Sequence, residues 1–179
     1  MDQKSSLGKS TIPYGIAFGV IMLLEFVISY SLGLTSKDNA WAGVLMSILN
    51  YLVLPILFIM LACNNFKNKL NGGFISFAQC IKAGVAVCVM AALVFSAVSS
   101  IVYLAAPQIK EDVLEQSKIA IAESPGMTAE GLKAAMKMSE LFMQPYIAIP
   151  LSILIYAIVG LIMSLIVGAI VKKDNPGAF

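Results

Sequence analysis

Glu25 is the only ionisable side chain deep inside one of the long apolar runs of this chain. A charge at the centre of a bilayer costs at least about 2.5 kcal/mol on insertion scales, so a carboxyl group there marks a candidate site. At about 1.5 Å per helical residue from the lysine-rich ends, Glu25 and Asn50 lie about 16 and 18 Å deep. Ser96 and Tyr156 lie about 20 and 22 Å deep by the same rise. These four residues are our candidate intramembrane polar site.

Two interpretations of Glu25 are open. It could be a protonatable site inside a helical bundle, or a neutral glutamic acid whose hydrogen bond to Asn50 or to a hydroxyl group holds the helices in register. Burial favours the neutral form of any carboxyl group, so the second interpretation requires no special function. We favour the second interpretation.

Other catalytic chemistry has little support, because the sequence contains no histidine and no arginine. The usual general base, the commonest metal ligand and the bidentate phosphate clamp are therefore missing. Walker, CxxC and HExxH motifs are also absent. The acids Glu111, Asp112 and Glu115 resemble a solvated helix face. We predict that the protein is not an enzyme and uses no cofactor.

Four methionines in the polar segment could suggest a Cu(I) site, because thioethers favour that ion. They are Met127, Met136, Met138 and Met143. Only Met136 and Met143 fall near one helical face, and neither histidine nor cysteine joins them. Methionine also packs adaptably on amphipathic helices. We therefore predict no metal site.

The composition is that of an integral membrane protein. Hydrophobic residues make up 59% of the 179 residues and charged residues only 12%, whereas soluble domains carry roughly 25% charged residues. Four continuous apolar runs each approach the roughly 20 residues that a helix needs to cross a bilayer. We predict an all-α, four-transmembrane-helix bundle forming one domain over residues 1–179. The spans are expected at about 13–34, 41–62, 83–106 and 146–171.

Two further elements are predicted between the spans. Phe74, Phe77 and Ile81 recur at helical spacing after two glycines, which favours a short interfacial amphipathic helix at about 74–82. The polar segment 107–145 predicts an extracytoplasmic helical hairpin, split at residues 124–126, with Thr128 as the N-cap of its second helix.

Small residues and prolines give local detail to the spans. Pro13 is expected to start the first span, and Pro55 to kink the second. Small residues at four-residue spacing let helices approach closely. They could pack inside this bundle or against a partner protein; we favour the first, although three such faces slightly exceed the needs of one bundle. The candidate helix-packing residues are Gly15, Gly19, Gly84, Ala92, Gly160, Ser164 and Gly168.

Lysine placement predicts the topology. The two termini and the connection between spans two and three carry seven lysines against two aspartates, a net +5. The opposite side carries five lysines against seven acids, a net −2. The positive-inside rule then places both termini in the cytoplasm and the hairpin outside.

Several short stretches resemble one known family. They are Gly-Gly-Phe-Ile-Ser-Phe-Ala-Gln at 72–79, Met-Thr-Ala-Glu at 127–130, Met-Ser-Glu-Leu-Phe-Met-Gln-Pro at 138–145, and Lys-Lys-Asp-Asn-Pro at 172–176 before Phe179. In order and spacing the chain resembles the bacterial membrane proteins grouped as domain of unknown function 4199. The resemblance covers essentially the whole chain. It implies a four-helix bacterial inner-membrane protein with a long loop between spans three and four, and no known catalytic residue. It also hints at an accessory role beside membrane glycosyltransferases.

These observations lead to two function hypotheses. The first is a non-catalytic inner-membrane protein that is an accessory or structural partner of another membrane component, such as a membrane glycosyltransferase. The alternative is a small oligomeric proton-linked transporter that uses Glu25. The expected partners are the lipid bilayer and either a membrane protein or further copies of the chain. Nucleic acid is not expected, because the cytoplasmic segments are short and lack arginine.

Overall fold

Helices make up the regular structure of the computed structural model, which describes residues 7–34, 40–123 and 126–175. The predicted all-helical fold is confirmed, and these ranges contain no strand. The elements are α1 (Leu7–Ser31), α2 (Ala40–Ile48), a π-helical turn η2 (Leu49–Val53), α3 (Leu54–Asn65), a second π-helical turn η3 (Phe66–Leu70), α4 (Phe77–Ala105), α5 (Pro107–Ala122), α6 (Ala129–Phe142) and α7 (Pro145–Val171).

Four helical segments in the described part of the chain are long and apolar enough to cross a membrane. They are α1, the continuous run Trp41–Leu70 from α2 through η3, α4 and α7, with mean hydropathies of 2.0, 2.5, 2.5 and 2.7. Large apolar side chains such as Leu24 and Ile101 are exposed on their outer faces. Contiguous apolar surface of this kind suits lipid better than water.

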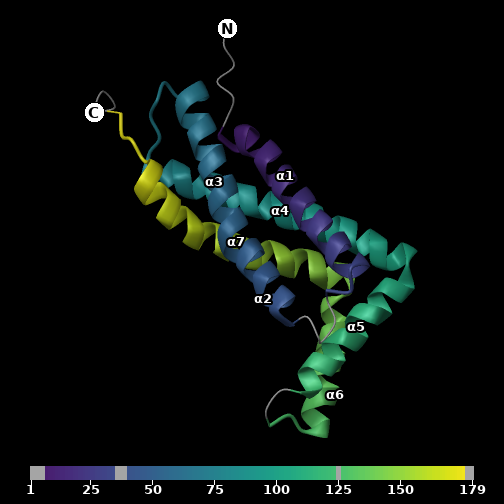
Figure 1. Ribbon diagram of the computed structural model, residues 1–179. Helices are drawn as coiled ribbons and strands as arrows, with labels where there is room; N and C mark the ends of the chain where they lie inside the picture. The colour runs from purple at the N-terminus through teal and green to yellow at the C-terminus, as the bar shows by residue number, and fades with distance from the viewer. Residues whose placement is uncertain (1–6, 35–39, 124–125, 176–179) are drawn as a thin grey trace.

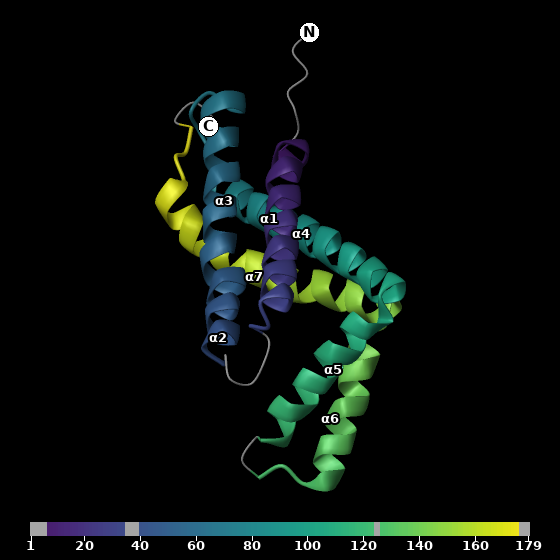
Figure 2. The same cartoon turned by 45° about the vertical axis from the view of Figure 1, so that its right-hand side comes forward.

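The four long segments cross in two pairs (Figures 1 and 2). α4 and α7 pack most extensively against each other, and α1 and α3 lie across them. The α5–α6 hairpin projects from the end where α4 stops and α7 begins. Thr128 caps α6 as predicted, its hydroxyl accepting from the Gly131 N–H. The predicted hairpin break includes Ser124 and Pro125, which lie outside the described residues.

Glycines set the close approach of α4 to α7. A Cβ atom added to Gly84 would lie 2.5 Å from the Ser164 Cβ, and one added to Gly160 would lie 2.8 Å from the Gly84 carbonyl oxygen. Further along α7, a Cβ on Gly168 would lie 3.0 Å from the Phe77 ring. This crossing therefore has no room for larger residues at these positions.

Glycines also allow the close contact between α1 and α4. A Cβ on Gly15 would lie 2.5 Å from the Met90 Cβ, and one on Gly19 would lie 2.8 Å from the Ala91 carbonyl oxygen. Ala92 is also buried. The small-residue faces of α1, α4 and α7 thus pack against one another inside this chain.

α4 begins at Phe77, between the start predicted for the interfacial helix, about 74, and the start predicted for the third span, about 83. Ser76 forms a capping box: its hydroxyl accepts from the Gln79 N–H at 3.2 Å, and the Gln79 side-chain oxygen accepts from the Ser76 N–H at 2.8 Å. This motif fixes a helix start, and α4 then continues without a break to Ala105. The short helix predicted at about 74–82 is therefore not a separate element, because residues 74–76 are not helical and the remainder forms the first turns of α4.

The bounds predicted for α1 also need correction. The helix is present from Leu7, and Pro13 lies inside it rather than at its start. The hydroxyls of Ser10 and Thr11, both buried, donate to backbone carbonyls three residues earlier, so their hydrogen bonds are satisfied within α1 itself.

The other end of α1 is a Schellman motif. The Leu34 N–H donates to the Ser29 carbonyl at 2.9 Å and the Gly33 N–H to the Tyr30 carbonyl at 3.1 Å. Gly33 has the left-handed φ of 63° that this motif requires. α1 consequently ends at Ser31, and not at Leu34 as predicted.

The end of α7 is joined to the connection between α3 and α4. The Lys67 ammonium donates to the Val171 carbonyl at 2.8 Å, and Ile75 exchanges two backbone hydrogen bonds of 2.9 Å with Lys173. The Lys173 ammonium lies 5.4 Å from the centre of the Phe74 ring. A cation at a helix C-terminus is favourable because the last carbonyls carry partial negative charge.

The second long segment extends to Leu70, beyond the predicted end at 62.

We predict that Lys67→Met lowers the free energy of unfolding by about 1 kcal/mol, because the last turn of α7 loses a cation in a partly buried position. Thermal unfolding of the purified protein measures this. Lys69→Met is the matched control, since Lys69 is exposed and two residues away in η3. Equal effects of the two substitutions would contradict the role given to Lys67.

Candidate functional site

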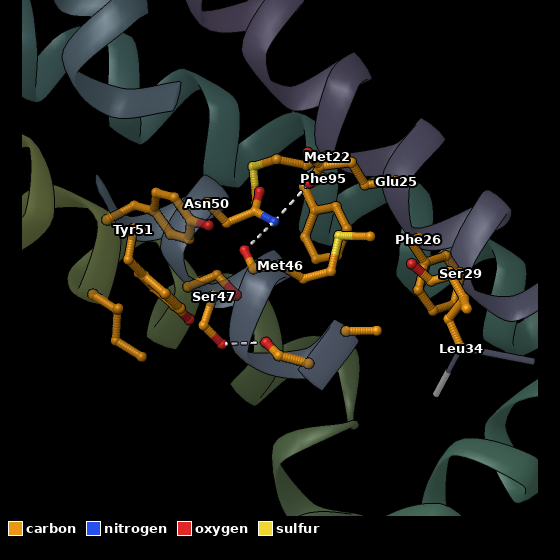
Figure 3. A pocket seen from close by; sticks show the side chains of 15 residues that line it. Met22, Glu25, Phe26, Ser29, Leu34, Met46, Ser47, Asn50, Tyr51 and Phe95 are labelled. Carbon is orange, nitrogen blue, oxygen red and sulfur yellow. Dashed lines mark hydrogen bonds between the residues drawn. The ribbon is translucent and has the colours of Figure 1, made fainter. Parts of the chain in front are cut away.

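A cavity of about 370 Å³ lies between α1, α2 with η2, α4 and α7 (Figure 3). Its wall is mostly apolar, with polar groups in a few places, as is typical of small-molecule sites. The lining residues are Met22, Glu25, Phe26, Ser29, Leu34, Ala42, Gly43, Met46, Ser47, Asn50, Tyr51, Phe95, Ser152, Ile155 and Tyr156.

The π-helical turn η2 and Pro55 explain why space is left here. Pro55 lacks an N–H group, and its ring would clash with the carbonyl one turn earlier in a regular helix. η2 ends at Val53, two residues before Pro55, and widens the helix, with the Leu54 N–H bonded to the Leu49 carbonyl. Beyond this turn α2 makes few contacts with the other long helices, whereas α3 packs on α1, α4 and α7. The cavity occupies the region that α2 leaves open.

Glu25 and Asn50 meet at this cavity. The Asn50 side-chain nitrogen donates to the Glu25 Oε2 atom at 2.6 Å and to the Met46 carbonyl at 3.0 Å (Figure 3). Both residues are half-buried. α1 and the second long segment are thus linked by a polar contact within their apolar surroundings, and the hydrogen bond between Glu25 and Asn50 expected in the second interpretation is present.

Two polar atoms at the cavity have no partner among the described residues. They are the Asn50 Oδ1 and the Ser29 Oγ, and both are buried. A buried polar atom without a hydrogen bond costs about 1–3 kcal/mol. Such atoms in a native site call for an explanation, and a bound group that hydrogen-bonds to them is one.

Aromatic rings close another side of the cavity. Tyr156 is almost fully buried and stacks on Tyr51, with ring centres 5.7 Å apart, while its edge meets Phe18 at 6.1 Å. Phe18 in turn stacks on Phe58 at 5.4 Å. Tyr156 therefore contributes a rigid wall and places its polar ring at the same cavity as Glu25.

Ser96 does not join this group. It is buried in α4, and its hydroxyl donates to the Ala92 carbonyl at 2.6 Å rather than to a cavity group. The structure thus brings together Glu25, Asn50 and Tyr156 but not Ser96, because a rise along the helix gives depth and does not give direction. The residue that sequence reasoning missed is Ser29, although its place four residues after Glu25 puts it on the same helix face.

Glu111, Asp112 and Glu115 are all exposed, as expected of a solvated helix face, and Asp112 makes one contact with the bundle. The Tyr30 hydroxyl donates to the Asp112 carboxylate at 2.6 Å. This contact joins the end of α1 to α5, close to the Phe26 and Tyr103 rings that meet edge to face at 6.1 Å. Asp112 therefore helps to hold the hairpin against the bundle.

Comparison with known families identifies one match, the family described as Protein of unknown function (DUF4199), over residues 13–173. The chain belongs to this family. No curated protein and no solved structure matches it. The region matched to DUF4199 includes every residue that lines the cavity, so the site lies within the part of the chain that defines membership.

Proposed function

We propose that this DUF4199 protein is a non-catalytic membrane protein that binds another component of the membrane, with the Glu25 cavity as its binding site. The supporting observation is the cavity itself, which combines an apolar wall with buried, unpartnered polar atoms. Its volume lies within the roughly 300–1,000 Å³ of small-molecule sites. The lining contains no nucleophile paired with a general base, which favours binding over catalysis.

The proposed location is the inner membrane of a bacterium, with both termini in the cytoplasm. Lysine placement supports this orientation. Lys67, the connection at Ile75 and the end of α7 gather at one end of the bundle, as a shared cytoplasmic side requires. The α5–α6 hairpin and the open region beside α2 then lie towards the outer side.

A small membrane-dissolved molecule fits these observations better than a protein partner. The small-residue faces that could receive a partner helix are occupied by α1, α4 and α7 themselves. A protein partner, such as the membrane glycosyltransferase suggested by the family resemblance, would have to bind the hairpin or the lipid-facing surfaces.

Native mass spectrometry after extraction from native membranes in a mild detergent tests the proposal. We expect a small-molecule mass in addition to the 19.1 kDa of the chain. Ser29→Leu should abolish it, because an isobutyl group would occupy the cavity. It should not lower stability, since it removes an unpaired buried hydroxyl. Ile28→Phe, which adds bulk on the exposed face of the same helix, is the matched control.

Loss of the extra mass in both variants, or its absence from the wild type, would refute cavity binding. A second protein at fixed stoichiometry would identify a protein partner instead.

Proton-linked transport by an oligomer is a second candidate, supported by the Glu25 carboxyl at the cavity wall. Glu25→Gln keeps the oxygen that accepts from Asn50 but cannot ionise. Under this hypothesis the substitution abolishes pH-dependent flux in reconstituted vesicles. Unchanged flux and pH response would eliminate it.

A further inference from the structure

The polar groups of the Glu25 cavity are unequal in their free hydrogen-bonding capacity. Asn50 has two N–H donors, and both are used, one by Glu25 and one by the Met46 carbonyl. These two acceptors also fix the orientation of the amide, because each requires the nitrogen to face it. The oxygen Oδ1 is left buried and unpartnered, and it can only accept.

Two further side chains reach the same polar wall as acceptors or with an engaged proton. The Ser47 hydroxyl donates to the Gly43 carbonyl at 2.9 Å, so its proton is also used. Glu25 offers carboxyl oxygens, and the unpartnered Ser29 hydroxyl lies one helical turn further along α1. The Glu25 and Asn50 oxygens are therefore acceptors on one wall of the cavity, and the hydroxyl groups of Ser29, Tyr51, Ser152 and Tyr156 at the same cavity can donate or accept.

The charges of the cavity lining also favour a ligand head that donates hydrogen bonds. The cavity lining contains one carboxyl group and no lysine, and the sequence has neither arginine nor histidine. An anionic head would find no cation to pair with in this lining, and beside an ionised Glu25 it would also meet a like charge at short range in an apolar site. A head that donates hydrogen bonds would satisfy the Asn50 oxygen and would be compatible with either form of Glu25.

The remaining lining is suited to an apolar chain. Met22, Phe26, Met46 and Phe95 surround the space beside the polar wall (Figure 3). Two rim residues on different helices, Tyr51 in η2 and Ile155 in α7, are more than a third exposed. The cavity thus opens sideways between these elements, towards the surface that faces lipid.

We propose that the Glu25 cavity binds a membrane-dissolved amphiphile with an apolar chain and a hydrogen-bond-donating head, an ammonium or a hydroxyl group, that carries no negative charge. The proposal rests on the proposed binding function and adds the chemical class of the ligand. The head lies against Glu25 and Asn50, with Ser29 available to a second donor, and the chain extends among the methionine and phenylalanine side chains.

The test uses the full chain in phosphatidylcholine nanodiscs, because the phosphatidylcholine head has no hydrogen-bond donor. Four probes share a dodecyl chain: dodecylamine, dodecane-1,2-diol, dodecyl methyl ether and dodecanoate. Binding is read from the rate at which a thiol reagent labels Cys63, Cys80 and Cys88 on heating. All three are fully buried, so labelling requires opening, and a ligand specific for the folded state slows it in a saturable way.

We expect saturable protection by the amine and the diol, and affinities at least about tenfold weaker for the ether and the carboxylate, since each lost hydrogen bond or added repulsion costs a substantial factor. Ser29→Leu should lose the protection, and Ile28→Phe should keep it. The Ser29→Leu protein also corrects for effects of the probes on the bilayer itself. Stronger protection by the amine than by the diol, removed by Glu25→Gln, would identify the head as an ammonium.

Equal protection by all four probes, or preference for dodecanoate, would refute the ligand class. If the native ligand mass still depended on Ser29, the binding function would survive that failure. If neither the probes nor a native ligand bound, the cavity would hold only water, and both proposals would fall together.

Discussion

Replacing Gly84 by alanine should lower the free energy of unfolding by about 1–3 kcal/mol, the usual cost of overpacking a tight core. The new Cβ would lie 2.5 Å from the Ser164 Cβ and 3.2 Å from the Gly160 carbonyl oxygen, so helices α4 and α7 must separate. Alanine favours a helix over glycine by about 1 kcal/mol, so packing must outweigh an opposing gain. Thermal labelling of the three buried cysteines measures the result.

Gly8→Ala is the matched control, because an added Cβ at this helical glycine meets nothing within 4 Å. It should leave stability unchanged or raise it. The double variant Gly84→Ala/Ser164→Gly should recover part of the loss, since it removes the nearest clashing atom. Equal stability of Gly84→Ala and the wild type would show that the α4–α7 crossing is looser than its geometry indicates.

Replacing Asn50 by leucine should be the second large effect. The Glu25 carboxyl would lose the 2.6 Å hydrogen bond that it accepts within a largely apolar wall. Leaving a buried polar group without its partner costs about 1–3 kcal/mol, and more if the group is charged. Unfolding measured by the same cysteine labelling should therefore occur at lower temperature.

A double-mutant cycle separates this cost from lost packing. Glu25→Leu in the Asn50→Leu background should restore most of the stability, because an apolar pair can replace a buried polar pair with little penalty. Glu25→Gln alone should stay close to wild type, since glutamine keeps an oxygen for Asn50. Additive losses in the double variant would contradict coupling between the two residues.

The number and approximate positions of the long helices could be predicted from the sequence. Continuous apolar runs predict the four long helices. Small residues repeat at multiples of four positions within a span, at Gly84 and Ala92 and again at Gly160, Ser164 and Gly168, and this indicates close-packed faces without identifying their partners. The residues at which individual helices begin and end were harder to predict. Ser76 and Gly33 decide where α4 begins and α1 ends. The first acts through side chain–backbone hydrogen bonds and the second through backbone hydrogen bonds, and apolar periodicity indicates neither.

The candidate site could be predicted only in part, because the sequence gives the depth of a residue in the membrane but not the direction of its side chain. Equal depth brought Glu25, Asn50 and Tyr156 under consideration, and the structure places all three at one cavity. Depth could not exclude Ser96, whose hydroxyl bonds within its own helix. Nor could it reveal Ser29, because the cavity exists only where η2 and Pro55 move α2 away from its neighbours.

The π-helical turn η2 also sets the rotational phase of everything that precedes it in the second long segment. Successive residues of an α-helix are about 100° apart around its axis. A π-helical turn accommodates one more residue than a regular turn, so the faces of α2 and α3 are out of step by about that angle. Deleting one residue between Asn50 and Pro55 would bring them back into step and turn Gly43 and Met46 away from the cavity. The number of residues in this short stretch thus determines which side chains form the cavity wall.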